Sequence, residues 1–137
     1  MNALSLVLIF KITATVLVWC VPLLLLPSSM LIEFGLPSQP NEVMFVRMLG
    51  WAYLALCIGY AFGLKASLQG KRALGPIWVG IVSNGGACAL LLLFGLSASW
   101  NDMSYLVQFI FWSSALATAV ITVGLWTWGV KGEGEAV

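Results

Sequence analysis

Charged side chains are few and clustered in this 137-residue chain, and their distribution constrains the fold more than any other feature. No Asp, Glu, Lys or Arg lies between Arg72 and Asp102, or between Asp102 and Lys131. One small core in water could not cover such segments, whereas a bilayer needs about 20 predominantly apolar residues for each spanning helix. The sequence therefore predicts a helical membrane protein.

Four segments are long and apolar enough to span a bilayer, and together they use nearly the whole chain. The composition agrees, because 8% of the residues are charged, against about 25% in soluble domains. We expect residues 1–137 to form a single all-α domain, an antiparallel bundle of four transmembrane helices. The predicted spans are Ser5–Pro27, Val43–Leu64, Leu74–Leu96 and Ser104–Gly129.

The connections between the spans differ in charge. The segment Lys65–Arg72 carries three basic residues and no acid, whereas Pro27–Glu42 carries Glu33 and Glu42 and no base. Lys and Arg are enriched in cytoplasmic loops. We therefore expect Lys65–Arg72 in the cytoplasm, and with four spans both termini there as well. Lys11 interrupts the first apolar run, so we expect that segment to be retained as a span rather than cleaved as a signal peptide.

The chain lacks several common chemical groups. It contains no histidine, its three cysteines fall on three different spans, and no Asp or Glu lies within a predicted span. The absence of histidine excludes metals and haem bound by histidine, and acid–base catalysis by histidine. The absence of Asp and Glu from the spans excludes a membrane carboxylate for proton coupling. We predict no catalytic residue, metal or cofactor, and no enzymatic activity. Nucleic-acid binding also has no support.

Arg47 is the sharpest anomaly, because an arginine in an apolar span is costly unless it has a partner or reaches the interface. It lies about one turn into the second span. We expect a structural ion pair with Glu33 or Glu42, with Glu33 favoured because it would tie the first span to the second. Contact with a lipid phosphate and binding of an anionic ligand are the alternatives.

Asn84 is a second anomaly, since it lies near the middle of the third span. Ser113, Ser114 or Thr118 on the fourth span is at a matching depth, so we expect an intramembrane polar contact that sets helix register. A polar binding pocket or pore is the alternative. For Lys11 we expect the amine to reach back to the cytoplasmic interface, with pairing to a partner chain as the alternative.

The second span carries small residues at four-residue spacing, namely Ala55, Gly59 and Gly63. Such residues let helices approach closely in lipid, where packing drives association. We predict a helix-packing face.

The segment Glu42–Gly63, E-V-M-F-V-R-M-L-G-W-A-Y-L-A-L-C-I-G-Y-A-F-G, resembles the second-helix region of small bacterial DoxX-like four-helix membrane proteins. The shared features are an arginine followed by Leu-Gly and a helix rich in small residues. The resemblance implies a four-helix bundle in a bacterial inner membrane, associated with other membrane or redox proteins, and it transfers no catalytic residue.

Two functions are compatible with these features. The first is an accessory or interaction subunit, embedded in the lipid bilayer and packed against another membrane protein or a second copy. The second is an oligomeric small channel or transporter with a polar path near Asn84. A membrane enzyme acting on lipid would need an acid–base or nucleophile constellation that the sequence does not suggest.

Overall fold

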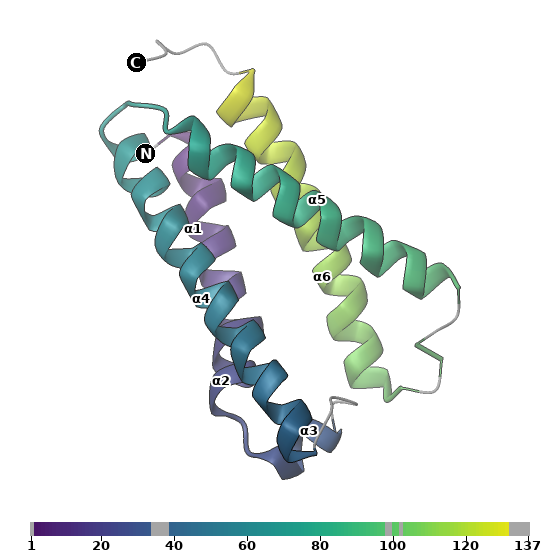
Figure 1. Cartoon of the computed structure of the whole chain (residues 1–137). Coiled ribbons are helices and arrows are strands. Elements are labelled where there is room, and N and C mark those ends of the chain that lie inside the picture. Colours follow the sequence, from purple (N-terminus) through teal and green to yellow (C-terminus); the bar gives the residue numbers. More distant parts are fainter. Residues whose placement is uncertain (1, 34–38, 98–99, 102, 132–137) are drawn as a thin grey trace.

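The computed structural model describes residues 2–33, 39–97, 100–101 and 103–131, and every regular element in these ranges is a helix (Figure 1). Four helical stretches are long and apolar enough to cross a membrane. The prediction of four spans is confirmed, and the chain is a small multi-pass membrane protein. The stretches are Ala3–Leu25, Glu42–Leu68, Leu74–Leu96 and Tyr105–Val130.

The first span consists of three pieces: α1 (Ala3–Thr15), a π-helical turn η1 (Val16–Cys20) and α2 (Val21–Leu25). Pro27 ends α2, because a proline forces the residue before it out of the helical conformation, and Leu26 is extended with ψ 134°. The short helix α3 (Ser28–Glu33) follows. The π-helical turn η1 thus comes directly before the helix turn that contains Pro22.

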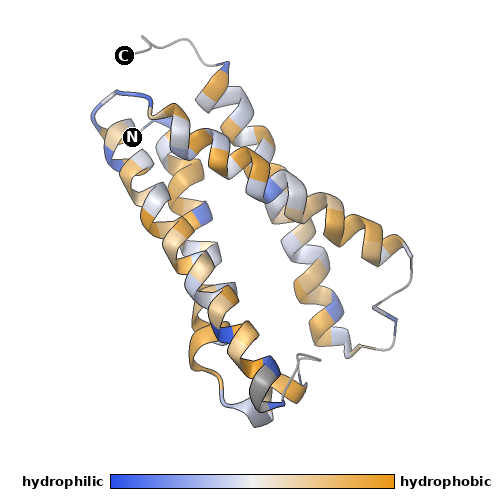
Figure 2. Cartoon of the chain, in the orientation of Figure 1, coloured by the Kyte–Doolittle hydropathy of each residue, from blue (hydrophilic) through white to orange (hydrophobic). Residues whose placement is uncertain are grey.

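The remaining helices are continuous over most of their length. They are α4 (Pro40–Leu68), α5 (Leu74–Leu96) and α6 (Tyr105–Gly124), and α6 ends in a π-helical turn η2 (Leu125–Val130). The carboxylate of Glu42 accepts a hydrogen bond from the Gln39 backbone N–H at 3.2 Å, which favours the start of α4. Apolar residues predominate along all four spans, with single hydrophilic residues within them, and the connection between α4 and α5 is hydrophilic (Figure 2).

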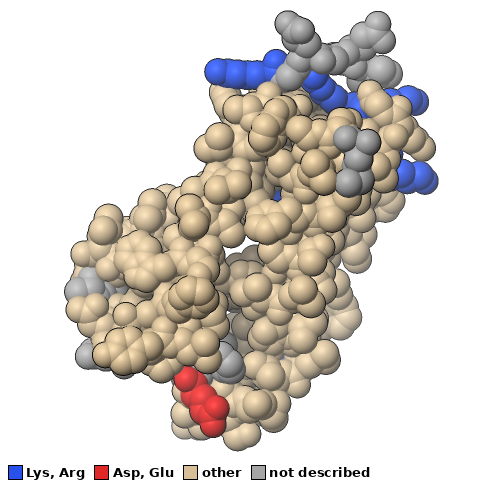
Figure 3. Space-filling model, turned by 180° about the vertical axis from the view of Figure 1, so that it is seen from behind, with Lys and Arg blue, Asp and Glu red and all other residues tan. Residues whose placement is uncertain are grey.

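Charge separates along the long axis of the molecule (Figure 3). The basic side chains Lys65, Lys71, Arg72 and Lys131 lie near the end of α4 or directly after η2, and we call this the basic end. Glu33 and Glu42 lie near the α3 to α4 connection, at what we call the acidic end. The chain passes back and forth between these two ends, and α1 starts at the basic end (Figure 1).

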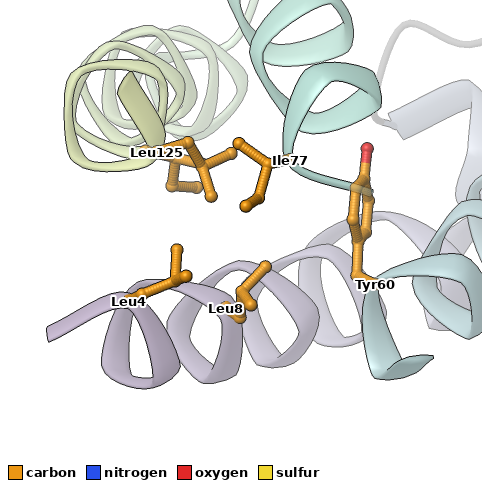
Figure 4. Close-up of a cluster of buried hydrophobic side chains, with 6 residues drawn as sticks. Leu4, Leu8, Tyr60, Ile77 and Leu125 are labelled. Carbon is orange, nitrogen blue, oxygen red and sulfur yellow. The ribbon is translucent and has the colours of Figure 1, made fainter. Parts of the chain in front are cut away.

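The spans pack as two helical hairpins, the first made of α1, η1, α2 and α4 and the second of α5, α6 and η2. At the basic end a buried cluster joins all four spans: Leu4, Leu8, Tyr60, Ile77, Ile121 and Leu125 (Figure 4). At the acidic end the second cluster, Leu23, Leu31 and Val46, belongs to the first hairpin and α3 alone. The hairpins therefore converge at the basic end and separate toward the acidic end (Figures 1 and 3).

Glycines and hydroxyl groups allow the close approach at the basic end. A Cβ atom on Gly80 would lie 2.5 Å from the Cδ1 atom of Leu125, closer than packed carbon atoms allow. The buried hydroxyls of Ser5 and Ser67 share a hydrogen bond of 2.9 Å between α1 and α4, and Asn2 Nδ2 donates to the Ser67 carbonyl at 3.1 Å. These contacts fix the start of the first span against the end of α4.

Candidate functional site

A buried amine lies among the four spans. Lys11 on α1 is 4% exposed, and its Nζ donates to Asn84 Oδ1 at 2.9 Å. The same Nζ atom lies 4.2 Å from the centre of the Tyr60 ring. A charge-assisted hydrogen bond and the face of an aromatic ring both stabilise an ammonium group.

The Lys11 side chain points into the bundle, whereas we expected its amine to reach back to the cytoplasmic interface. Leu4, Leu8 and Lys11 follow the spacing of one helix face, and all three are buried. Because this face of α1 is covered by the other spans, the amine finds its partners inside the protein. Neither Asn84 nor Tyr60 was predicted as a partner of Lys11.

Asn84 also links the amine to Ser83 and, through Ser83, to the Tyr60 hydroxyl. Its Nδ2 donates to the Gly80 carbonyl at 2.6 Å and lies 3.4 Å from Ser83 Oγ. Ser83 Oγ in turn shares a hydrogen bond of 2.8 Å with the Tyr60 hydroxyl. We call Lys11, Tyr60, Ser83 and Asn84 the polar cluster.

The hydroxyl residues on the fourth span that we expected to contact Asn84 have other surroundings. Thr118 donates to the carbonyls of Ser114 and Ala115 in its own helix, at 2.8 and 3.0 Å, as hydroxyl residues in helices commonly do. Ser114 is buried and Ser113 is exposed. In place of the predicted contact with Ser113, Ser114 or Thr118, Asn84 therefore bonds to Lys11 and to its own helix.

The polar cluster forms one end of a cavity of about 290 Å³ that all four spans border. Thr15, Ser114 and Thr118 add hydroxyl groups to its wall. From the helical rise of 1.5 Å per residue, Tyr53 lies about 10 Å and Phe94 about 15 Å from the polar cluster, toward the acidic end. The cavity wall beyond the cluster is apolar and aromatic: Trp19, Tyr53, Leu56, Ala87, Leu90, Leu91, Phe94 and Trp100.

A larger groove of about 570 Å³ runs between the first span and α6. Its outer rim includes the exposed side chains of Phe10, Phe109 and Leu116. Groove and cavity adjoin, because five residues line both: Thr15, Trp19, Asn84, Ser114 and Thr118. The inner cavity thus lies directly beside a groove on a face of the protein that the bilayer would cover.

Arg47 binds backbone carbonyls of the first span rather than a carboxylate. Its Nη1 donates to the Leu23 carbonyl at 2.5 Å, and Nη2 donates to the Leu26 carbonyl. In a continuous helix the Leu23 carbonyl would accept from residue 27, but Pro27 has no N–H. Arg47 supplies the missing donor.

The ion pair expected with Glu33 or Glu42 has no counterpart in the part of the chain that the structure describes. Glu33 is exposed at the end of α3, and Glu42 accepts the bond from Gln39. Arg47 ties the first span to the second through the carbonyl groups of Leu23 and Leu26 instead.

The predicted packing face on α4 divides between two environments. A Cβ atom on Gly63 would meet the Pro76 Cβ atom at 2.9 Å, so this residue packs inside the bundle. Gly59 has no atom within 4 Å of its Cβ position, and Ala55 is exposed. Because residues four apart on a helix are rotated by about 40°, the three positions drift from the outer surface to the interior.

The three cysteines lie on three different spans. Cys20 on the first span and Cys57 on α4 are both buried and free. Cys88 is a partly buried free thiol on α5. Among the residues in the described ranges, no group of three or more His, Cys, Asp or Glu side chains could hold a metal ion.

Comparison with models of known families, with curated proteins and with solved structures finds no match for this chain.

Proposed function

We propose that the chain is a non-catalytic accessory subunit of a membrane complex in a bacterial inner membrane. Its four helices form an antiparallel bundle, and its basic end, with both termini, faces the cytoplasm. The orientation is supported by the separation of basic and acidic side chains, because Lys and Arg favour the cytoplasmic side. The resemblance of Glu42–Gly63 to DoxX-like proteins supports the membrane and the association with other chains.

The observation that carries the accessory role is the outer face of α4. Ala55 and Gly59 form a shallow strip, with open space at the Cβ position of Gly59. Ile58 and Phe62 beside the strip are 55% and 69% exposed. Small residues next to large apolar ones allow a transmembrane helix to approach closely and pack. We assign this face to a transmembrane helix of another chain.

Photocrosslinking in native membranes tests the assignment. A photoreactive amino acid at Ile58 should form an adduct with a different membrane protein, and Gly59→Leu should abolish that adduct by filling the strip. Gly86→Leu is the matched control, since Gly86 on α5 also has no atom within 4 Å of its Cβ position. Adducts with lipid alone, or an adduct that survives Gly59→Leu, would refute the accessory role. An adduct between two copies would replace the heteromeric partner with a second copy.

A small channel or transporter is the second candidate, and the polar cluster beside a cavity favours it. The buried cluster of Leu4, Leu8, Ile77 and Leu125 closes the basic end, so conduction would require those side chains to separate. Solute flux in proteoliposomes that is lost in Asn84→Ala, with the fold retained, would favour this candidate. Absence of flux for the purified wild-type chain would count against it.

A further inference from the structure

The Lys11 amine is a cation without an acidic partner in the bundle. The sequence contains no Asp or Glu at positions 3–32, 43–101 or 104–130. Asn84 and Tyr60 are neutral, so neither side chain that contacts the amine balances the charge of its ammonium form. An enclosed charge of this kind is costly, and it favours occupation of the adjoining space by an anion.

The amine also has hydrogen-bonding capacity that its contacts do not use. An ammonium group has three N–H donors. Of the described residues, Asn84 accepts one of them at 2.9 Å, and the face of Tyr60 lies at 4.2 Å. Lys11 itself lines the 290 Å³ cavity, so a head group placed there can accept a further bond.

The shape and lining of the cavity determine the rest of the ligand. One end carries the polar cluster, and the remaining wall is formed largely by Trp, Tyr, Leu and Phe side chains. The ligand must therefore have a small anionic head and an apolar body. The cavity is also small, since its 290 Å³ lies just below the usual range of about 300–1,000 Å³ for ligand pockets.

The route of entry points to the bilayer as the source. The cavity adjoins the groove between the first span and α6 through five shared residues, whereas packed side chains close the basic end. A transmembrane helix about 10 Å in diameter is much larger than a cavity of 290 Å³ can hold, so a single acyl chain fits better than a partner helix.

We propose that this cavity binds a single-chain amphipathic carboxylate, a long-chain fatty acid, with its head group on Lys11 and its hydrocarbon chain along the aromatic wall and the groove. One ammonium group balances one carboxylate. The site uses the interior of the bundle and not the outer face of α4, so it can be tested separately from the accessory role.

Binding of radiolabelled oleate to the purified full-length chain in mild detergent tests this site. Oleate should bind saturably, and Lys11→Met should weaken binding by about tenfold or more, because it removes a charge-assisted hydrogen bond. Lys65→Met, which removes an exposed cation at the basic end, is the matched control and should leave the affinity unchanged. Equal binding by wild type and Lys11→Met would overturn the proposal.

Competition separates the carboxylate from other ligands of the same length. Unlabelled oleate should displace the probe, whereas oleyl alcohol should compete about tenfold less well in the wild type and equally well with oleate in Lys11→Met, because only the carboxylate gains the charge-assisted bond. Displacement by dioleoyl phosphatidylglycerol at lower concentrations than oleate would contradict the fatty-acid assignment in favour of a phospholipid.

A second measurement keeps the test valid if Lys11→Met does not fold. A photoreactive fatty acid with a diazirine near its tail should label the wild-type chain at the cavity or groove wall, at residues such as Phe94 or Phe109. Excess oleate should suppress that labelling. Labelling confined to the outer face of α4, or insensitive to oleate, would refute the site.

Discussion

Arg47 satisfies a backbone carbonyl that Pro27 leaves without a donor. We predict that Arg47→Met lowers the free energy of unfolding by about 2 kcal/mol, since hydrogen bonds to charged groups contribute about 1.5–3 kcal/mol. In a Pro27→Ala background the cost should be smaller, because the alanine has a backbone N–H that can donate to the Leu23 carbonyl. Reversible unfolding of the wild type, the two single variants and the double variant in detergent measures the coupling. Additive effects would show that Arg47 acts independently of the proline.

The pairing of Lys11 with Asn84 gives a second prediction at this scale. Asn84→Ala should destabilise the wild type by about 1–3 kcal/mol, because the buried amine loses its acceptor. In a Lys11→Met background the same substitution should cost less, since no charge remains to be satisfied. The unfolding free energies of the two single variants and the double variant provide the test. An equal cost in both backgrounds would argue against the contact.

The sequence identified these unusual residues better than it identified their partners. Lys11, Arg47 and Asn84 stand out because each is a polar group within an apolar span. Depth in the membrane follows from counting residues, but the direction of each side chain depends on how every helix is rotated about its axis. For Arg47 a signal was available, since Pro27 necessarily leaves the Leu23 carbonyl without its helical donor.

The spacing of small residues along the helices decides which faces can pack. Gly80 lies against Leu125, whereas Gly86 on the same helix meets nothing within 4 Å. We predict that Gly80→Ala lowers the melting temperature, because the added Cβ atom displaces Leu125, while Gly86→Ala leaves it unchanged or raises it through higher helix propensity. Thermal unfolding in the same detergent compares them. A greater loss at Gly86 would contradict the packing described for α5.

Span limits were predictable to within a few residues, because apolar length alone sets them. The predicted third span coincides with α5, and the others differ by one to four residues at their ends. The separation of the two hairpins was not predictable in this way. It depends on which glycines face which helices, as at Gly63 and Gly80, and this does not follow from hydropathy.

At the scale of the whole molecule, the separation of charge predicts a single orientation. In a background without native cysteines, Gln69→Cys at the basic end should react with membrane-impermeant maleimide only after the cells are opened. Asn101→Cys, in the connection between α5 and α6, should react in intact cells. The reverse pattern would invert the topology, and labelling of both sites in intact cells would exclude a single orientation.

The contact between Lys11 and Asn84 joins the two hairpins at one end of the cavity. Both the proposed fatty-acid site and the channel or transporter function depend on this contact. Solid-state NMR of the chain in lipid bilayers, with ¹⁵N-labelled lysine and ¹³C-labelled asparagine, observes this contact directly. We predict a correlation between a lysine Nζ and an asparagine Cγ that disappears in Asn84→Ala. Absence of the correlation in the wild type, or its persistence in Asn84→Ala, would contradict the enclosed amine.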